Sequence, residues 1–249
     1  MRRFFVGPDA VNSAVVSISG SEARHIKNVL RLKPGDIIRL FDGTGIEYEA
    51  AIVHLTAGRV ELSITGKVIS AVESPIELTI AQGYLKEKKM DSLIRPLCEL
   101  GMSRWVPFIS QRSVPRPDKK RLDARLQRWH KIASESLKQC RRSVLPQISP
   151  PLSFDGVLEY GRFCDLRILF WEQEARVFDR NALTESMNPV KQVLIVLGPE
   201  GGFAEQEVEK ARQLGFTISG LGPRILRAET ATIAACTLIQ HLFGDLSQK

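Results

Sequence analysis

The 249-residue chain is 43% hydrophobic and 25% charged, which is ordinary for a globular protein and sufficient for one or two domains with substantial cores. Its apolar runs fall well short of the roughly 20 residues that cross a bilayer, so we expect no membrane partner and a cytoplasmic protein. The net charge of +7 is compatible with an acidic partner but does not identify one.

The first 72 residues are typical of a small β-rich domain. Strand patterns cover residues 15–18, 37–41, 47–54 and 59–65, and turn residues separate them. One helix is expected to begin at Ser21, with Ile26, Val29 and Leu30 facing inward. This pattern favours a small barrel, followed by a linker at about residues 70–75.

From residue 76 onward, strand and helix patterns alternate. The expected strands at 76–81, 105–109, 166–170 and 193–197 are separated by helical segments such as 88–100. Such alternation predicts a mainly parallel sheet with helices on both faces. Lys86, Lys88 and Lys89 follow the first of these strands on the usual ligand side. They either touch RNA or keep the surface soluble, and the sequence does not separate the two.

Basic charge is concentrated in residues 112–142, which contain eleven Lys and Arg residues and three acidic ones, a net charge of +8. The rest of the chain therefore sums to about −1. The helix expected there has an apolar stripe from Leu122 to Cys140, while Arg121, Arg125 and Arg128 face elsewhere. A localised basic face of this kind is typical of a nucleic-acid surface.

A glycine turn follows the strand at 193–197. Its sequence, Gly198-Pro199-Glu200-Gly201-Gly202, matches neither the dinucleotide fingerprint nor the P-loop. Glu200, Glu205 and Glu207 would also repel a pyrophosphate at the following helix. A cationic nucleoside such as S-adenosylmethionine fits better, although an ordinary strand-to-helix turn remains the alternative.

A second unusual loop, residues 222–231, places Arg224, Arg227 and Glu229 among apolar residues at the start of an Ala-rich helix. These charges are expected either to act on a substrate or to form a buried Arg-Glu pair that holds the loop.

The cysteines and histidines point to no metal chemistry. Cys98, Cys140, Cys164 and Cys236 are widely spaced without a C-x-x-C pair, and no H-E-x-x-H motif occurs. Reduced thiols and no metal site are expected.

The segments 197–203 and 221–231 together resemble the 16S ribosomal RNA uridine-N3 methyltransferases of the SPOUT class. The resemblance continues along the whole chain, in the expected order, at 1–5, 25–31, 99–101, 112–113 and 139–143. One departure is Arg141, where the family usually has glycine.

The resemblance implies a two-domain α/β fold. Residues 1–72 would form a PUA-like RNA-binding β-barrel, and residues 73–249 a SPOUT methyltransferase domain with a trefoil knot. It ties the final helix, with its small Ala231, Ala234 and Ala235, to the knot and to a dimer interface. A homodimer is therefore expected.

The resemblance also implies the site. Catalytic roles would belong to Arg227, for electrostatic stabilisation or substrate placement, to Glu229, for orientation or proton acceptance, and to Arg142, in the substrate pocket. S-adenosyl-L-methionine would be held by Leu197, Gly198, Glu200, Gly201, Gly202, Leu221, Gly222, Ile225 and Leu226. The expected RNA contacts are Arg2, Arg3, Arg24, Arg31, Lys86, Arg112, Arg121, Arg125 and Arg128.

The implied reaction is methylation of N3 of a uridine in 16S ribosomal RNA, in the small ribosomal subunit. Two alternatives remain open at this point. A knotted methyltransferase could act on a ribose 2′-hydroxyl, or the chain could be a catalytically silent RNA-binding factor in ribosome assembly. The product nucleoside and cofactor binding distinguish them.

Overall fold

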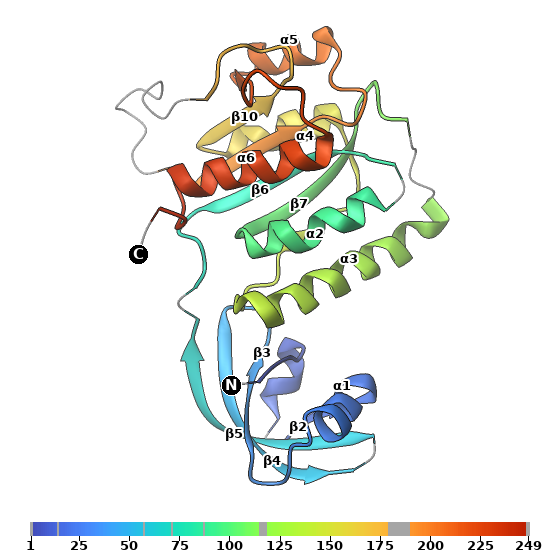
Figure 1. Cartoon of the computed structure of the whole chain (residues 1–249), viewed down its shortest axis with the longest axis vertical. Coiled ribbons are helices and arrows are strands. Elements are labelled where there is room, and N and C mark those ends of the chain that lie inside the picture. Colours follow the sequence, from blue (N-terminus) through green and yellow to red (C-terminus); the bar gives the residue numbers. More distant parts are fainter. Residues whose placement is uncertain are drawn as a thin grey trace. The chain divides into compact units, whose positions relative to one another are not determined.

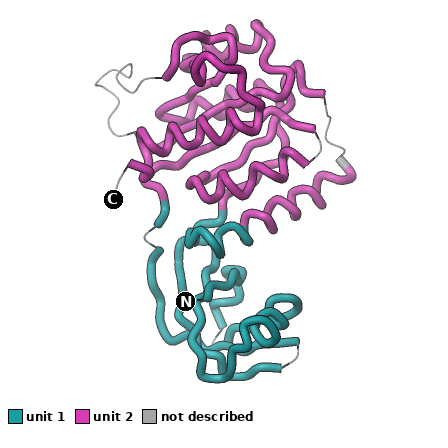
Figure 2. The backbone as a smooth tube through the Cα atoms, viewed as in Figure 1, with its two compact units in different colours: residues 1–73, 134–145 teal, residues 74–133, 146–249 magenta. Residues whose placement is uncertain are grey.

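The computed structural model describes residues 2–13, 15–56, 58–70, 72–86, 88–114, 119–178 and 190–247. The chain divides into two compact units, coloured separately in Figure 2. Unit 1 comprises Met1–Glu73 and Ser134–Leu145, and unit 2 comprises Ser74–Ala133 and Pro146–Lys249. Unit 1 thus takes a short segment that the sequence analysis placed with the second domain.

Unit 1 is built on a five-stranded sheet in the order β1-β3-β4-β5-β2 (Figure 1). Only the β1 and β3 pair is parallel. Its strands are β1 (Arg3–Phe5), β2 (Val16–Ser19), β3 (Ile37–Phe41), β4 (Ile46–Leu55) and β5 (Arg59–Ile69). Register shifts interrupt the long β4 and β5 pair, and such irregularities bend and twist strands. Buried residues such as Phe4, Ile18 and Leu40 form the core of this unit.

The helix expected from Ser21 is shorter and less regular than its pattern suggests. After η1 (Pro8–Asn12), the helix α1 (Gly20–Arg24) continues as a π-helical turn, η2 (His25–Val29). The N–H of Leu30 donates to the carbonyl of His25, 3.0 Å away. A wider turn shifts the periodicity away from 3.6 residues. Ile26 is buried as expected, but the expectation for Val29 is wrong, since it is 65% exposed.

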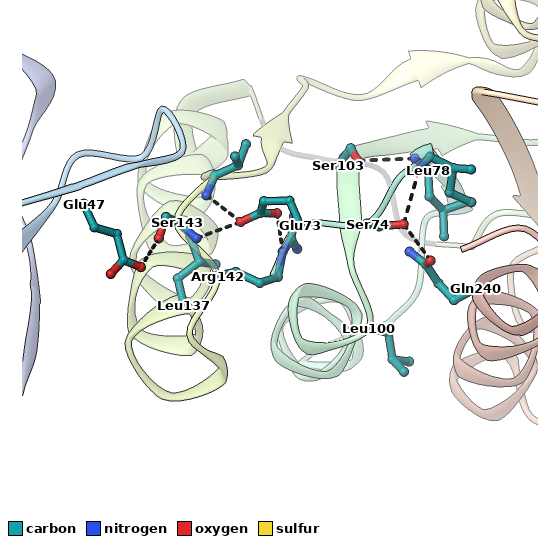
Figure 3. A network of polar contacts seen from close by, with 12 residues as sticks. Glu47, Glu73, Ser74, Leu78, Leu100, Ser103, Leu137, Arg142, Ser143 and Gln240 are labelled. Carbon is teal, nitrogen blue, oxygen red and sulfur yellow. Dashed lines mark hydrogen bonds and ion pairs between the residues drawn. The ribbon is translucent and has the colours of Figure 1, made fainter. Parts of the chain in front are cut away.

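Hydrogen bonds and ion pairs join the segment 134–145 to the rest of unit 1. The Arg3 guanidinium donates to Glu47 Oε1 at 2.6 Å, to the Arg142 carbonyl at 2.9 Å and to Ser143 Oγ at 2.8 Å. The carboxylate of Glu73 accepts from the Ser143 N–H at 2.7 Å and from Arg142 Nε at 2.9 Å, as Figure 3 shows. The buried positions of Arg142 and Ser143 make this segment part of the interior of unit 1.

Unit 2 contains a sheet in the order β12-β10-β11-β6-β7-β8, with β9 also paired to β7. Every pairing in it is parallel, which confirms the expected mainly parallel sheet. The strands are β6 (Glu77–Gly83), β7 (Met102–Ile109), β8 (Gln147–Ile148), β9 (Leu152–Ser153), β10 (Leu166–Phe170), β11 (Gln192–Leu197) and β12 (Thr217–Ser219). Strand β11 pairs with β6, the first strand of unit 2. The glycine turn that follows β11 therefore lies beside the end of β6.

Helices cover this sheet. They are α2 (Lys89–Glu99), α3 (Lys119–Cys140), α4 (Phe154–Tyr160), η3 (Gly161–Phe163), α5 (Glu205–Gln213) and α6 (Ala228–Leu242). Phe154 of α4 and Val208 of α5 pack in a core with Val196 of β11. The alternate strand residue Ile195 is also fully buried, so both faces of the strand are covered. None of the helices that the structure describes is long and apolar enough to span a membrane.

Candidate functional site

A cavity of about 500 Å³ lies in unit 2, where the loops after β10, β11 and β12 meet the start of α6. Its position outside the carboxyl ends of parallel strands is the usual ligand side of such a sheet. Arg227, Glu229 and all nine residues expected to hold the cofactor line it. These nine are Leu197, Gly198, Glu200, Gly201, Gly202, Leu221, Gly222, Ile225 and Leu226.

The glycine turn after β11 is shaped by close backbone approaches. The N–H of Gly202 donates to the Pro199 carbonyl at 2.9 Å, and Gly202 has a φ of +67°, which favours glycine. Gly83 at the end of β6 lies directly against this turn. A Cβ added at Gly83 would be 2.5 Å from the nitrogen of Pro199. Only a glycine at 83 lets the turn take this position.

A buried glutamine connects the turn to α6. Gln82 is fully buried, and its Nε2 donates to the Gly198 carbonyl at 3.0 Å. Its Oε1 accepts from Thr232 Oγ1 of α6 at 2.5 Å. Sequence reasoning missed Gln82 and Gly83, although a glycine that ends the first strand of an α/β unit was a signal for close backbone approach.

Three charged side chains of the cavity form one cluster. Lys89 Nζ lies 3.3 Å from Oε1 of Glu200 and 3.3 Å from Oε1 of Glu229. Burial alone would raise the pKa of Glu200, but hydrogen bonds from the N–H of Lys86 and from Lys89 hold this pKa below its usual value. The sequence left open whether Lys89 contacts RNA or keeps the surface soluble. In the structure Lys89 is a residue of the cavity.

Arg224 and Arg227 add positive charge to the cavity that no ion pair among the described residues neutralises. Both side chains are exposed, and in the part of the chain that the structure describes neither makes an ion pair or hydrogen bond. Arg227 is the N-cap residue of α6, with φ −63° and ψ 149°. The buried Arg-Glu pair that was the alternative explanation of this loop is not found, because Glu229 is paired with Lys89 instead.

The residues that line the cavity fit S-adenosylmethionine. Its volume lies in the usual range for small-molecule sites, and apolar residues and glycines line much of it. Two of its lining residues have a buried polar atom without a partner among the described residues, Trp171 Nε1 and Glu229 Oε2. Such atoms need a donor and an acceptor from elsewhere. Glu172 and Glu200 add negative charge, which suits a sulfonium, so the residues fit.

Arg142 lies in unit 1 and does not line the cavity. It is 4% exposed, and its Nε is 2.9 Å from Oε2 of Glu73. Next to it, Arg141 has a φ of +69°, so an arginine occupies the left-handed position that commonly ends a helix with glycine. Although the family usually has glycine at this position, Arg141 leaves the end of α3 in its ordinary conformation.

Most of the expected RNA contacts are on the surface of their units. The exposed ones are Arg2, Arg24, Arg31, Lys86, Arg112, Arg121 and Arg128. Arg112 Nη1 also donates to the Gly201 carbonyl at 3.4 Å, so it reaches the glycine turn. Arg128 is 61% exposed while its Nε lies 2.7 Å from Asp91.

Two of the expected RNA contacts are occupied inside their units. The Arg3 side chain is 8% exposed and pairs with Glu47. It also donates to the Arg142 carbonyl of the segment 134–145. Arg125 donates to the hydroxyl of Tyr84 and lies over its ring, 5.6 Å from the centroid. Arg3 in particular differs from its expected role as a phosphate contact, since its guanidinium is used internally.

Comparison with known proteins identifies the class of protein that this fold and cavity define. Residues 72–240 match the model of an RNA methyltransferase domain, and residues 18–65 match that of an RNA methyltransferase PUA domain. The chain is thus built as an RNA methyltransferase with a PUA domain.

Individual relatives narrow the class to a family. The chain is 32% identical over 247 residues to the ribosomal RNA small subunit methyltransferase E of Bacillus subtilis, covering 97% of this chain and 96% of the relative. It is 34% identical to the protein of the same name from Buchnera aphidicola of Schizaphis graminum, covering 94% and 93%. The Neisseria gonorrhoeae member, solved bound to S-adenosyl methionine, has a TM-score of 0.85 and 31% identity over 99% of both chains. The chain belongs to the ribosomal RNA small subunit methyltransferase E family.

Proposed function

We propose that the chain transfers a methyl group from S-adenosyl-L-methionine to N3 of a uridine in 16S ribosomal RNA. One observation carries the proposal. The glycine turn 198–202 and the loop 222–231, which are far apart in the sequence, line the same cavity and bring acids and free arginines together there. Family membership supports the ribosomal substrate, since the relatives are named for the small subunit RNA.

The cofactor would be held by the two loops. The glycines of the turn line the cavity together with Leu221, Gly222, Ile225 and Leu226, and Trp171 adds an indole donor. The ionised Glu200 would offset the positive charge of the ligand. When bound, S-adenosylmethionine supplies a methyl group on a sulfonium, which a positioned nucleophile can accept without covalent catalysis by the protein.

Arg227 and Glu229 would act on the base. A uridine must lose the proton on N3 to accept a methyl group there, and negative charge then spreads onto the ring carbonyls. The free guanidinium of Arg227 would stabilise that charge. Oε2 of Glu229, which is buried without a partner among the described residues, would accept the proton. The arrangement requires neither a nucleophilic cysteine nor a metal ion.

The proposal also includes the expected knot, homodimer, cellular location and domain boundary. The methyltransferase domain would contain a trefoil knot and form a homodimer through the region of α6, in a cytoplasmic protein that acts on the small subunit. The domain boundary would lie near residue 73, with the segment 134–145 returning to the PUA domain. Arg142 does not line the cavity, so it would act on the substrate pocket only indirectly, as part of the segment 134–145.

RNA would bind along the exposed arginines of unit 1. Arg24 and Arg31 are exposed and have no ion pair among the described residues. Arg31 has a φ of +55° because it follows Leu30, the C-cap residue of η2, in the left-handed position that commonly ends a helix. Its exposed guanidinium, and not its backbone, makes it a candidate for a phosphate contact.

The variant Arg24→Gln/Arg31→Gln should weaken RNA binding and flatten its salt dependence. The slope of log K against log salt concentration is negative, and each lost phosphate contact makes it shallower by about 0.7 for single-stranded RNA. Fluorescence anisotropy at several salt concentrations measures the slope. The control is Arg59→Gln/Lys67→Gln, since Arg59 is paired with Glu61 and Lys67 lies over the Tyr48 ring. Equal slopes for the two double variants would place the RNA surface elsewhere.

The reaction is tested by incubating the protein with labelled S-adenosylmethionine and small ribosomal subunits that lack the modification. Nucleoside mass spectrometry of the digested RNA should show N3-methyluridine. A 2′-O-methylated nucleoside would retain the enzyme class and overturn the base assignment. An absence of transfer to subunits and to free RNA, together with failure to bind the cofactor, would support a silent assembly factor.

A further inference from the structure

Lys89 is the first residue of α2, and its side chain connects the two loops of the cavity. Its Nζ is 3.3 Å from Glu200, in the glycine turn after β11, and 3.3 Å from Glu229, in the first turn of α6. The Lys89 side chain is 37% exposed, and it lines the cavity together with both acids. One ammonium group of α2 therefore contacts two other segments that are far apart in the sequence.

The two carboxylate oxygens of Glu229 are in different situations. Oε1 is paired with Lys89, whereas Oε2 is buried and has no hydrogen-bond partner among the residues that the structure describes. A buried acceptor without a donor is costly, and native proteins rarely keep one without a function. The pairing of Oε1 with Lys89 leaves Oε2 as the oxygen of this carboxylate that lacks a donor among the described residues.

Glu200 anchors Lys89 in turn. Its Oε1 accepts the Lys86 N–H at 3.1 Å, so the carboxylate is held by the backbone as well as by Lys89. The hydrogen bond that Lys89 donates to Glu200 also raises the pKa of Lys89, which keeps its side chain cationic at neutral pH. Without this cation, the carboxylates of Glu200 and Glu229 would have no positive charge between them.

We propose that Lys89 is a positioning residue that holds Oε1 of Glu229 and thereby directs Oε2 to the N–H proton of the substrate base. The inference rests on the proposed function and deepens it. In the step concerned, the N–H bond breaks, its electron pair stays on the base nitrogen, and the proton moves to Oε2. The other charged residues that line the cavity are Glu172, Glu200, Arg224 and Arg227.

The first test is a set of crystal structures of ligand-free Lys89 variants. In Lys89→Met and Lys89→Gln, Oε1 of Glu229 loses its cationic partner, so the Glu229 carboxylate should leave its wild-type position. Lys89→Arg should keep the carboxylate in place.

The matched control for these structures is Lys210→Met. Lys210 also makes an ion pair in unit 2, with Asp155 at 2.7 Å, but it does not line the cavity. It should leave the Glu229 carboxylate in its wild-type position. An unmoved carboxylate in both neutral Lys89 variants would overturn the proposal, as would an equal displacement in Lys210→Met.

The second test is a double-mutant cycle in the methylation assay. Lys89→Met should lower kcat about 10- to 100-fold, which is part of the roughly 10²- to 10⁴-fold that a general base contributes, while the Kd of S-adenosylmethionine by calorimetry stays within about threefold. If Lys89 acts through Glu229, adding Lys89→Met to Glu229→Gln should cause little further loss. Full additivity of the two losses would overturn the role, as would a kcat unchanged by Lys89→Met. The crystal structures do not use the reaction, so a failed product assignment is separable from a failed role for Lys89.

Discussion

Arg227→Ala should abolish most methyl transfer and leave cofactor binding nearly intact. The guanidinium of Arg227 has no partner in the described part of the chain, so its removal leaves no buried charge behind and disturbs no ion pair. Loss of one positioned group that stabilises developing charge lowers kcat about 10²- to 10³-fold. Single-turnover methylation measures this loss, and calorimetry should give a Kd for S-adenosylmethionine within about threefold of wild type.

Arg212→Ala is the appropriate control for Arg227→Ala. Arg212 is half-exposed on α5, forms an ion pair with Glu209 of the same helix and does not line the cavity. Its kcat should equal that of wild type. An unchanged kcat in Arg227→Ala would remove the residue from catalysis, and a lost calorimetric signal would reassign it to cofactor binding.

Gly83→Ala should damage both the stability of unit 2 and cofactor binding. The added methyl group would meet the nitrogen of Pro199 at 2.5 Å and the carbonyl carbon of Gly198 at 2.9 Å, and this backbone cannot yield as a flexible side chain could. Overpacking of this kind costs about 1–3 kcal/mol, which lowers Tm by about 2–12 °C in a protein of this size. The displaced turn should weaken S-adenosylmethionine binding about tenfold or more, since about 1.4 kcal/mol of lost contact is a factor of ten.

A matched glycine separates this clash from the general effect of a methyl group. Gly156 lies in the first turn of α4, where a Cβ would approach nothing closer than Ser153 Oγ at 3.4 Å. Gly156→Ala should therefore keep or slightly raise Tm, because alanine reduces the entropy of the unfolded chain and favours helix. Cofactor binding should not change. If calorimetry and thermal unfolding show Gly83→Ala to be as benign as Gly156→Ala, the approach of β6 to the turn does not constrain the site.

The parts of the site that could be predicted are those encoded locally. A β-branched run, a glycine turn and an acidic helix start made the turn at 198–202 recognisable, and the parallel sheet placed it on the ligand side. The loop 222–231 was conspicuous because its charges interrupt an apolar pattern. Their convergence in one cavity required the strand order, in which β11 and β12 both pair with β10.

The parts that escaped prediction depend on contacts between distant residues. Nothing near Lys89 in the sequence indicates that it meets Glu200 and Glu229, which are more than 100 positions later. Arg3 resembled a surface cation, but the end of α3 supplies acceptors that bury it. Val29 followed the helical period, which the π-helical turn then broke.

The helix α3 has a consequence for anyone who wishes to isolate either part of the molecule. Its residues up to Ala133 belong to unit 2 and those from Ser134 to unit 1, so the polypeptide crosses from one unit to the other after residues 73, 133 and 145. A fragment that stops at Glu73 would keep Arg3 and Glu47 but lose the carbonyls of Leu137 and Arg142 to which Arg3 donates. Buried guanidinium donors would then have no acceptors. An excised RNA-binding part would have to carry residues 134–145 on an engineered connection.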